Sequence, residues 1–229
     1  MLGLTECCLW LNIGAERKTA MRLVVIGCEY SGKSTLLEGL MEWGQKRGIH
    51  HHLDDHFTIP DCQMLRTEEE RESMLAMPQV IKERFQRFQL AYHVYLLHRY
   101  EHITLGGFHI EESVYGPRYY YPSIGRVAEH GRSWEASMPP ETMLVLLTAR
   151  PDVIAERMER APHQYQVVPK EDIQAVLDEF QAEFGASWLR RKFRIDTSDL
   201  SPKGLLEAFL EASFSHLTEK DMLIRMRHE

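Results

Sequence analysis

Long apolar runs, paired cysteines and an excess of basic residues are all missing from this sequence of 229 residues. No apolar stretch approaches the roughly 20 residues that a membrane-spanning helix needs, so we expect no membrane partner. The formal net charge of -7 argues against a nucleic-acid polymer as ligand, because phosphate-backbone binding usually needs a basic surface. We expect reduced thiols and a cytoplasmic location, because no C-x-x-C pair occurs among the four cysteines, Cys7, Cys8, Cys28 and Cys62.

Residues 1–20 show little regular pattern. Their short apolar patch, Leu9 to Ile13, follows an acidic residue and precedes the basic pair Arg17 and Lys18, which is the wrong order for a signal peptide. Met21 stands directly before the first β-branched run. We therefore interpret residues 1–20 as a loosely attached, disordered extension or as the product of an upstream translation start. Residues 21–229 are expected to form one domain, since this length suits a single α/β core.

Two kinds of apolar pattern alternate along residues 21–229. Short apolar or β-branched runs predict strands at 23–26, 49–53, 103–110, 142–147 and 193–195. Longer stretches with helical spacing or helix-end signals predict helices at 33–46, 78–100, 151–160, 169–190 and after Pro202. The alternation predicts an α/β fold of three layers, with a parallel sheet of about five strands flanked by helices. The helix at 78–100 is expected to be amphipathic, with an apolar face of Val80, Phe85, Phe88, Tyr92, Tyr95 and Leu96.

A phosphate-binding motif lies between the first predicted strand and the first predicted helix. Residues 27–34, Gly-Cys-Glu-Tyr-Ser-Gly-Lys-Ser, satisfy G-x-x-x-x-G-K-[ST]. Its glycines let successive backbone N–H groups face one anion, and the positive end of the following helix adds to that field. Lys33 can reach the β- and γ-phosphates, and the Ser34 hydroxyl can bind Mg²⁺. We therefore expect ATP and Mg²⁺ as ligands, with the nucleotide bound by Gly27, Tyr30, Ser31, Gly32, Lys33, Ser34 and Thr35.

Signatures of several other P-loop classes are missing: an N-K-x-D box for guanine, an L-S-G-G-Q-like ABC segment, and enough chain for an AAA lid domain. Small kinases remain, and their chemistry needs charge neutralisation and a proton acceptor where strands end. Asp54 and Asp55 follow the second predicted strand, and Glu111 and Glu112 follow the third. We predict that Asp54 or Asp55 orients or deprotonates the acceptor, and that Glu111 helps to hold the metal.

Residues 110–119, Ile-Glu-Glu-Ser-Val-Tyr-Gly-Pro-Arg-Tyr, resemble the E-R-S-V-Y-x-x-R-Y segment of deoxynucleoside kinases. The resemblance implies that Glu111 lies beside the acceptor hydroxyl and Mg²⁺, and that Arg118 contacts the acceptor or its phosphates. It also nominates Glu112 and Tyr115 for the acceptor side. Glu112 stands where that family has its first arginine, so the charge there is inverted.

Residues 151–158, Pro-Asp-Val-Ile-Ala-Glu-Arg-Met, resemble the P-E-V-x-x-E-R-I segment before the lid of thymidylate and deoxynucleoside kinases. This implies that Arg157 lies against the ATP base or phosphates, that Arg160 is a lid arginine, and that the lid spans about 158–169. Phe88-Gln89 is similar to the F-Q pair that binds the acceptor base in deoxynucleoside kinases. The acid pair in residues 53–57 is similar to the D-D-F of uridine kinases.

These patterns predict an ATP-dependent kinase that transfers the γ-phosphoryl group to a small acceptor, either a nucleoside or a nucleoside monophosphate. Two alternatives stay open. One is a P-loop kinase of a non-nucleotide alcohol, which Glu112 in the arginine's place keeps open. The other is an ATP-binding regulatory protein without phosphotransfer. The sequence also leaves a homodimer open.

Overall fold

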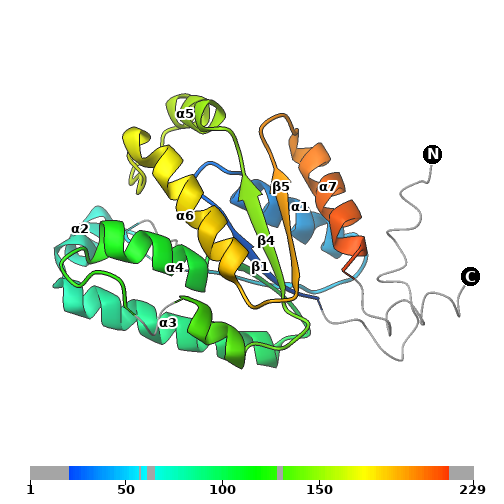
Figure 1. Cartoon of the computed structure of the whole chain (residues 1–229), viewed down its shortest axis with the longest axis horizontal. Coiled ribbons are helices and arrows are strands. Elements are labelled where there is room, and N and C mark those ends of the chain that lie inside the picture. The colour runs from blue at the N-terminus through cyan, green and yellow to red at the C-terminus, as the bar shows by residue number, and fades with distance from the viewer. Residues whose placement is uncertain (1–20, 57, 61–64, 128–130, 217–229) are drawn as a thin grey trace, which may run out of the picture.

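A computed structural model describes residues 21–56, 58–60, 65–127 and 131–216, so the expected extension at 1–20 lies outside the described residues. Five strands form one sheet in the order β2-β3-β1-β4-β5, and all four pairings are parallel. Helices cover both faces of this sheet (Figure 1). The predicted three-layer α/β fold is confirmed. The strands are β1 Met21–Ile26, β2 His52–Asp55, β3 His102–Gly106, β4 Met143–Thr148 and β5 Arg191–Asp196.

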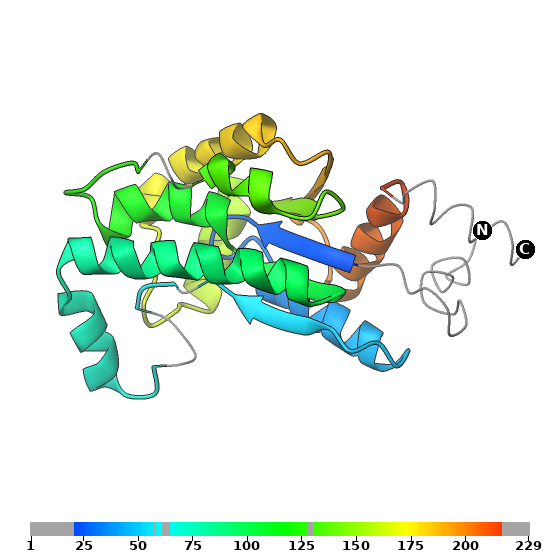
Figure 2. The same cartoon turned by 90° about the horizontal axis from the view of Figure 1, so that it is seen from below.

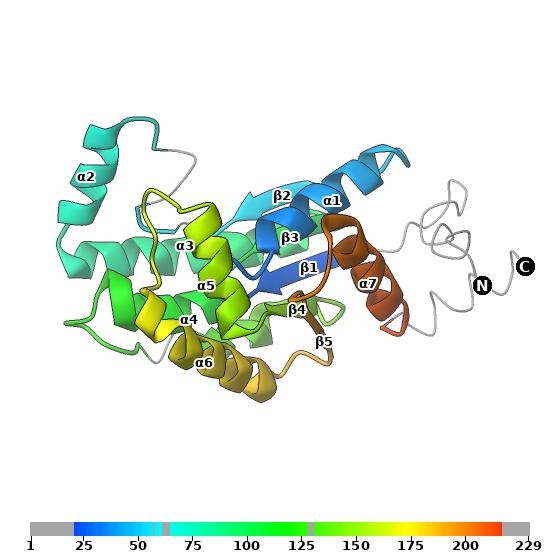
Figure 3. The same ribbon diagram turned by 90° about the horizontal axis from the view of Figure 1, so that it is seen from above.

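Successive side chains of β1 point to opposite faces of the sheet, as they do in any β-strand. Leu23 and Val25 pack with helices α1 (Lys33–Gln45) and α7 (Pro202–Phe214), whose buried residues include Leu36 and Phe209. Figure 3 shows these two helices side by side over one face. All of these side chains are fully buried, and each full burial of this kind stabilises the fold by about 1.5–3 kcal/mol.

Val24 and Ile26 of β1 point into the larger core on the other face. That face is covered by α3 (Gln79–Arg99), α4 (His109–Tyr115) and α6 (Ile173–Ala186), and α2 (Glu68–Ala76) lies beyond the start of α3 (Figure 2). Helix α5 (Pro151–Arg160) follows β4. The short segments are η2 Gly116–Tyr120, η3 Gly131–Ser137 and η4 Lys170–Asp172. In the part of the chain that the structure describes, no helix is long and apolar enough to span a membrane.

The predicted apolar face of α3 is wrong for most of its residues. Phe88 is 71% exposed, and Val80, Tyr92 and Tyr95 are more than half exposed. Polar side chains turn inward instead, because they find partners there: Lys82 Nζ, for example, donates to the carbonyl of Leu75 at 2.7 Å. The buried residues of α3 are Lys82, Glu83, Gln86, Leu90, His93, Leu96 and Leu97.

The predicted strand at 103–110 ends early, at Gly106. Gly107 and Phe108 have φ of +78° and +86°, and these two turns lead the chain directly into α4. Glu111 and Glu112 therefore lie in the first turn of a helix, not after a strand. The predicted helix at 169–190 is also shorter, because η4 precedes α6 and α6 ends at Ala186.

Candidate functional site

The loop at 27–32 joins β1 to α1 where the parallel strands end. Tyr30 and Gly32 have φ of +62° and +98°, so the backbone turns twice within three residues. The Ser31 N–H donates to the carbonyl of Cys28 at 3.1 Å, and the Leu36 N–H donates to the Gly32 carbonyl at 3.0 Å to begin the helix. This is the curled backbone with a helix N-terminus behind it that an anion site needs.

Gly27 has no room for a side chain. A Cβ atom built there would lie 2.4 Å from the Leu147 carbonyl oxygen and 2.5 Å from Ser31 Oγ, and φ is +156°. Gly27→Ala is therefore expected to lower the free energy of unfolding by about 2–4 kcal/mol through overpacking against backbone. Urea denaturation measures this. The matched control is Gly39→Ala in α1, where the nearest atom lies at 3.8 Å, and it should be neutral or slightly stabilising. Equal stabilities of the two variants would contradict this account of the loop.

Lys33 begins α1 and turns its ammonium back over the loop. Its Nζ donates to the Gly27 carbonyl at 2.7 Å and to Glu111 Oε2 at 2.6 Å. The two side chains are 18% and 6% exposed. Burial opposes the charge on Lys33, but the Glu111 carboxylate, helped by Asp55, outweighs it and raises the pKa of Lys33 above its ordinary value. The ammonium therefore stays charged at neutral pH.

Asp55 ends β2 beside this ion pair. The surrounding protein weakens its hydration, and the Glu111 carboxylate repels its charge, so its pKa rises from 3.8 to about 7 although Lys33 acts in the opposite direction. The residue is nevertheless exposed to solvent, because it lies in the wall of an open, concave site. Gly106, paired with Asp55 in the sheet, leaves the space for it: a Cβ there would lie 2.5 Å from Asp55 Oδ1. A carboxyl with such a pKa is suited to general base catalysis near neutral pH.

A cavity of about 430 Å³ joins the loop, the ion pair and Asp55. Arg157 and Arg160 of α5 line it from the other side, together with Ala161 and His163 of the segment after α5. Figure 3 shows α5 near the start of α1. The cavity thus combines backbone at a helix N-terminus, one buried ammonium and the carboxylates of Glu29, Asp55 and Glu111. Ten of the predicted site residues line it: Tyr30, Gly32, Lys33, Ser34, Thr35, Asp55, Glu111, Tyr115, Arg157 and Arg160.

No protein-family model and no curated protein sequence matches the chain. Solved structures share its fold. The YorR protein of Bacillus subtilis, in complex with phosphorylated GDP, matches over 87% of this chain and 100% of its own, with a TM-score of 0.57 and 16% identity. Deoxyadenosine kinase of M. mycoides with bound dATP matches over 85% and 100%, with a TM-score of 0.56 and 11% identity. The chain therefore shares the α/β fold of these nucleotide-binding structures, one of which is a kinase.

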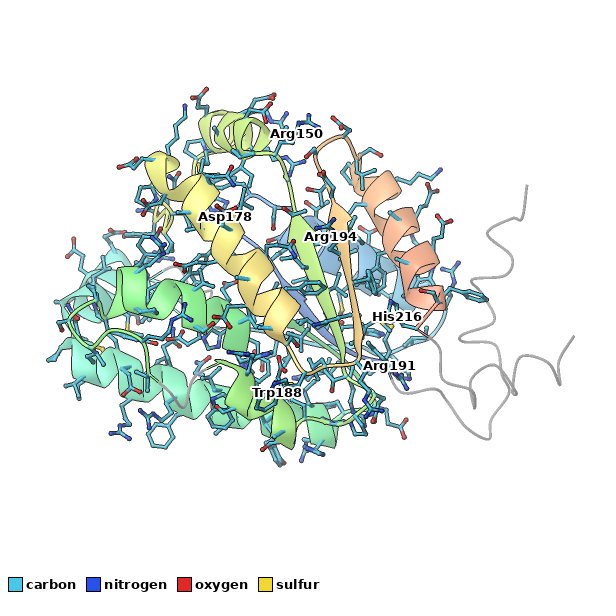
Figure 4. All side chains as sticks on the ribbon, in the orientation of Figure 1. Arg150, Asp178, Trp188, Arg191, Arg194 and His216 are labelled. Atoms are coloured by element: carbon cyan, nitrogen blue, oxygen red, sulfur yellow. The ribbon has the colours of Figure 1, made fainter. Side chains whose placement is uncertain are left out.

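Arg157 ties three parts of this fold together. Its guanidinium donates to the Tyr30 carbonyl at 2.8 Å and to the Thr197 carbonyl at 2.7 Å. Thr197 Oγ1 in turn donates to the Ser31 carbonyl at 2.9 Å. Nearby, Arg150 binds Asp199 at 2.8 Å, and Figure 4 shows Arg150 where α5 begins, beside the connection from β5 to α7. The phosphate loop is thus braced from α5 and from the end of β5.

The fold offers oxygen ligands for Mg²⁺ in the expected place. The Ser34 hydroxyl and the Glu111 carboxylate both line the cavity, and hard oxygen donors suit this ion. Within the described ranges, no group of three His, Cys, Asp or Glu could hold a metal. Mg²⁺ bound by one or two protein ligands takes its other ligands from phosphate and water oxygens. Bound there, the ion would neutralise charge on the β- and γ-phosphates.

Among the predicted site residues outside the phosphate loop, four do not line the cavity. Arg118 pairs with Glu179 of α6 at 2.6 Å. Glu112 is fully buried, 2.9 Å from His56 Nε2, and accepts a hydrogen bond from Tyr121. These contacts separate Glu112 from Glu111 although the two are adjacent in α4. The four residues are Asp54, Gln89, Glu112 and Arg118.

Helix α3 carries a second Phe-Gln pair, Phe85-Gln86, besides the predicted Phe88-Gln89. Gln86 is fully buried, whereas Phe88 is 71% exposed and Gln89 is only half-buried. Gln86, and not Gln89, is therefore the glutamine of α3 that faces the protein interior. Both Phe-Gln pairs can be seen in the sequence, three residues apart. Which glutamine faces inward depends on how the helix is oriented, and the sequence does not show this.

Proposed function

We propose that this protein is an ATP-dependent kinase that transfers the γ-phosphoryl group to a hydroxyl of a small uncharged acceptor, with nucleosides as the favoured class. One observation carries the proposal. Lys33 Nζ lies over the phosphate loop, 2.6 Å from Glu111, in a cavity that also contains Asp55. Phosphoryl transfer needs positioning, charge neutralisation and a proton acceptor. Lys33, Asp55 and Glu111 can supply the charge neutralisation and the proton acceptor.

Each side chain has a role in this proposal. Lys33 draws negative charge from the β,γ-bridging region of ATP, and Ser34 with Glu111 holds Mg²⁺. Asp55 accepts the proton of the acceptor hydroxyl. Arg157 and Arg160 act from the side of α5, where the lid excludes water that would otherwise take the phosphoryl group.

The charges around Lys33 support an uncharged acceptor. Asp55 and Glu111 line this side of the cavity, so a second anion would be repelled there. Arg118, which would hold an acceptor phosphate in the deoxynucleoside kinase pattern, is paired with Glu179 outside the cavity. A monophosphate is therefore less favoured than a nucleoside. A non-nucleotide alcohol fits the same charges and stays an alternative, as does a regulatory protein that binds ATP without transfer.

The test is ADP formation at millimolar magnesium with matched acceptors: nucleosides, their monophosphates, neutral polyols and sugar acids. We expect nucleosides to raise ADP formation above the acceptor-free rate, with a mass increase of one phosphoryl group on the acceptor. Monophosphates should be poorer by at least about tenfold, since one extra unfavourable contact of about 1.4 kcal/mol has this effect. Lys33→Met is the control for contaminating kinases.

The outcomes separate the candidates. Turnover with polyols alone would favour the non-nucleotide kinase. ATP binding without turnover on any acceptor would favour the regulatory protein and overturn the kinase proposal. The cytoplasmic location and the homodimer stay predictions, checked by fractionation and by the mass of the protein in solution.

A further inference from the structure

A connecting segment, residues 161–168, runs from α5 toward α6 and is called the lid here. Figure 3 shows it rising from α5 toward α2 before it returns to α6. The phosphate loop holds it by side chains, not only by packing. Glu29 Oε2 accepts hydrogen bonds from the backbone N–H groups of Val167 at 2.9 Å and Val168 at 2.8 Å. Tyr30 Oη accepts another from the His163 N–H at 2.8 Å, and the two rings stack at 4.3 Å.

The outer side of the lid has weaker attachments. Glu68 of α2 accepts hydrogen bonds from the side chains of Gln164 and Tyr165, and Arg71 lies over the Tyr165 ring at 5.8 Å. The two hydrogen bonds to Glu68 are exposed, and exposed polar contacts contribute little. The Glu29 side chain, by contrast, is only 11% exposed. The firm attachment of the lid is therefore to the phosphate loop.

A carboxylate within a phosphate loop is unexpected on electrostatic grounds. Glu29 lines the same cavity as Lys33, so its charge would repel a nearby triphosphate. Burial raises the pKa of Glu29, although the amides of Val168 and Val167 favour the charged form. Anion binding thus does not explain this residue. The two lid amides do, because each would be left without its acceptor if the carboxyl were absent.

We propose that Glu29 is a positioning residue that holds the lid against the phosphate loop through the main chain of Val167 and Val168. With the lid held, Arg160, the last residue of α5 before the lid, stays on the cavity wall, and water is kept from the transferred group. The effect on phosphoryl transfer rests on the proposed function. The attachment of the lid does not, and it is measurable in the protein alone.

Amide hydrogen exchange of the nucleotide-free protein tests the attachment. Glu29→Leu keeps most of the side-chain volume and removes the acceptor, so exchange at Val167 and Val168 should rise by about 10- to 100-fold. Glu29→Gln should stay close to the parent protein, because both hydrogen bonds end on a single oxygen that an amide carbonyl can replace. Glu29→Asp keeps the charge but shortens the reach of the carboxylate, so exchange at Val167 and Val168 should rise as it does in Glu29→Leu. It replaces Glu29→Leu in this test if the leucine variant folds poorly.

Two further variants locate the effect. Tyr30→Phe removes the acceptor for the His163 N–H but keeps the ring, so exchange should rise at His163 and not at Val167 or Val168. Glu207→Gln in α7 removes an exposed carboxylate far from the lid in sequence and should change none of these rates. Unchanged exchange at Val167 and Val168 in both Glu29→Leu and Glu29→Asp overturns the proposal.

Kinetics then test the consequence. In Glu29→Leu we expect kcat for transfer to fall at least about fivefold, while the share of ATP hydrolysed without acceptor rises, because a loose lid admits water. The Gln variant should recover most of the transfer. A change confined to the KM of the acceptor would mean that Glu29 binds the acceptor, and would overturn the positioning role. If the parent protein transfers no phosphoryl group but its lid exchange responds as described, the proposed function fails and the attachment stands.

Discussion

Lys33→Met is expected to lower phosphoryl transfer by about 100- to 1,000-fold, the loss typical of removing one preorganised charge-stabilising group. Methionine preserves the length of the side chain and removes only the ammonium. The measurement is kcat with the best acceptor at saturating ATP. The variant should also be less stable, by up to about 3 kcal/mol, because Glu111 is 6% exposed and loses its cationic partner.

A double variant separates these two effects. Lys33→Met with Glu111→Gln removes both charges, so stability should largely return while transfer stays low. Chemical denaturation and kinetics on the same samples give both quantities. If the single variant kept more than a tenth of the transfer rate, the ammonium would not be the charge that stabilises the transition state, and the proposed function would lose its main support.

The sequence predicted the architecture well wherever one local rule sufficed. The β-branched run before Gly27 and the start of α1 at Lys33 were both correct, because the motif itself states where the strand stops and the helix begins. Helix α5 was predicted with its observed bounds, Pro151–Arg160, since proline at the first position starts it. The order of the strands in the sheet has no such local signal.

The prediction failed where tertiary contacts overrode periodicity. Aromatic residues at helical spacing suggested the buried face of α3. That helix instead packs a face of leucine and polar side chains inward, where His93 Nε2 lies 3.9 Å from Asp54 Oδ1. We predicted one strand over the apolar run 103–110, because the sequence alone does not reveal that Phe108 has a positive φ. Propensity is a weak prior, and here partners distant in sequence decided the structure.

The candidate site was predicted unevenly for the same reason. Lys33 and Glu111 were named from a motif and a resemblance, and the fold brings them within 2.6 Å of each other. Arg118 was named from the same resemblance, yet Glu179, which lies 61 residues away in sequence, binds it outside the cavity. Glu29 was not singled out, because its partners are main-chain amides that no sequence pattern reveals.

Asp55→Asn is expected to lower transfer by about 100- to 10,000-fold, the contribution of a general base, since an amide cannot accept the acceptor proton. In the parent protein, kcat/KM should rise with pH and level off above about 7, as the Asp55 carboxyl loses its proton. The pH–rate profile of the parent protein, compared with that of Asp55→Asn, measures this. A profile that is flat between about pH 5 and 8 would contradict the role of Asp55 as base.

The same substitution should stabilise the fold, which distinguishes a base from a structural acid. The pKa of Asp55 is raised in the folded state from 3.8 to about 7, so the stability it contributes is present below 3.8 and is lost as pH rises through 7. A shift of three pKa units corresponds to about 4 kcal/mol. Solvent reaches this carboxylate, and screening should reduce the gain in Asp55→Asn to about 1 kcal/mol at pH 8.

Asp54 provides the matched control, because its pKa moves in the other direction. Burial would raise the pKa of Asp54, but the neighbouring His93 and the Asp55 N–H, which donates to Asp54 Oδ1 at 2.9 Å, outweigh it, so the folded-state pKa lies below its ordinary value. Its stabilisation is therefore present at neutral pH and is lost as pH falls. Asp54→Asn should cost stability at pH 8 and spare most of the transfer, the reverse of Asp55→Asn on both measurements. If the two variants changed both stability and phosphoryl transfer in the same directions, the roles assigned to Asp54 and Asp55 would be wrong.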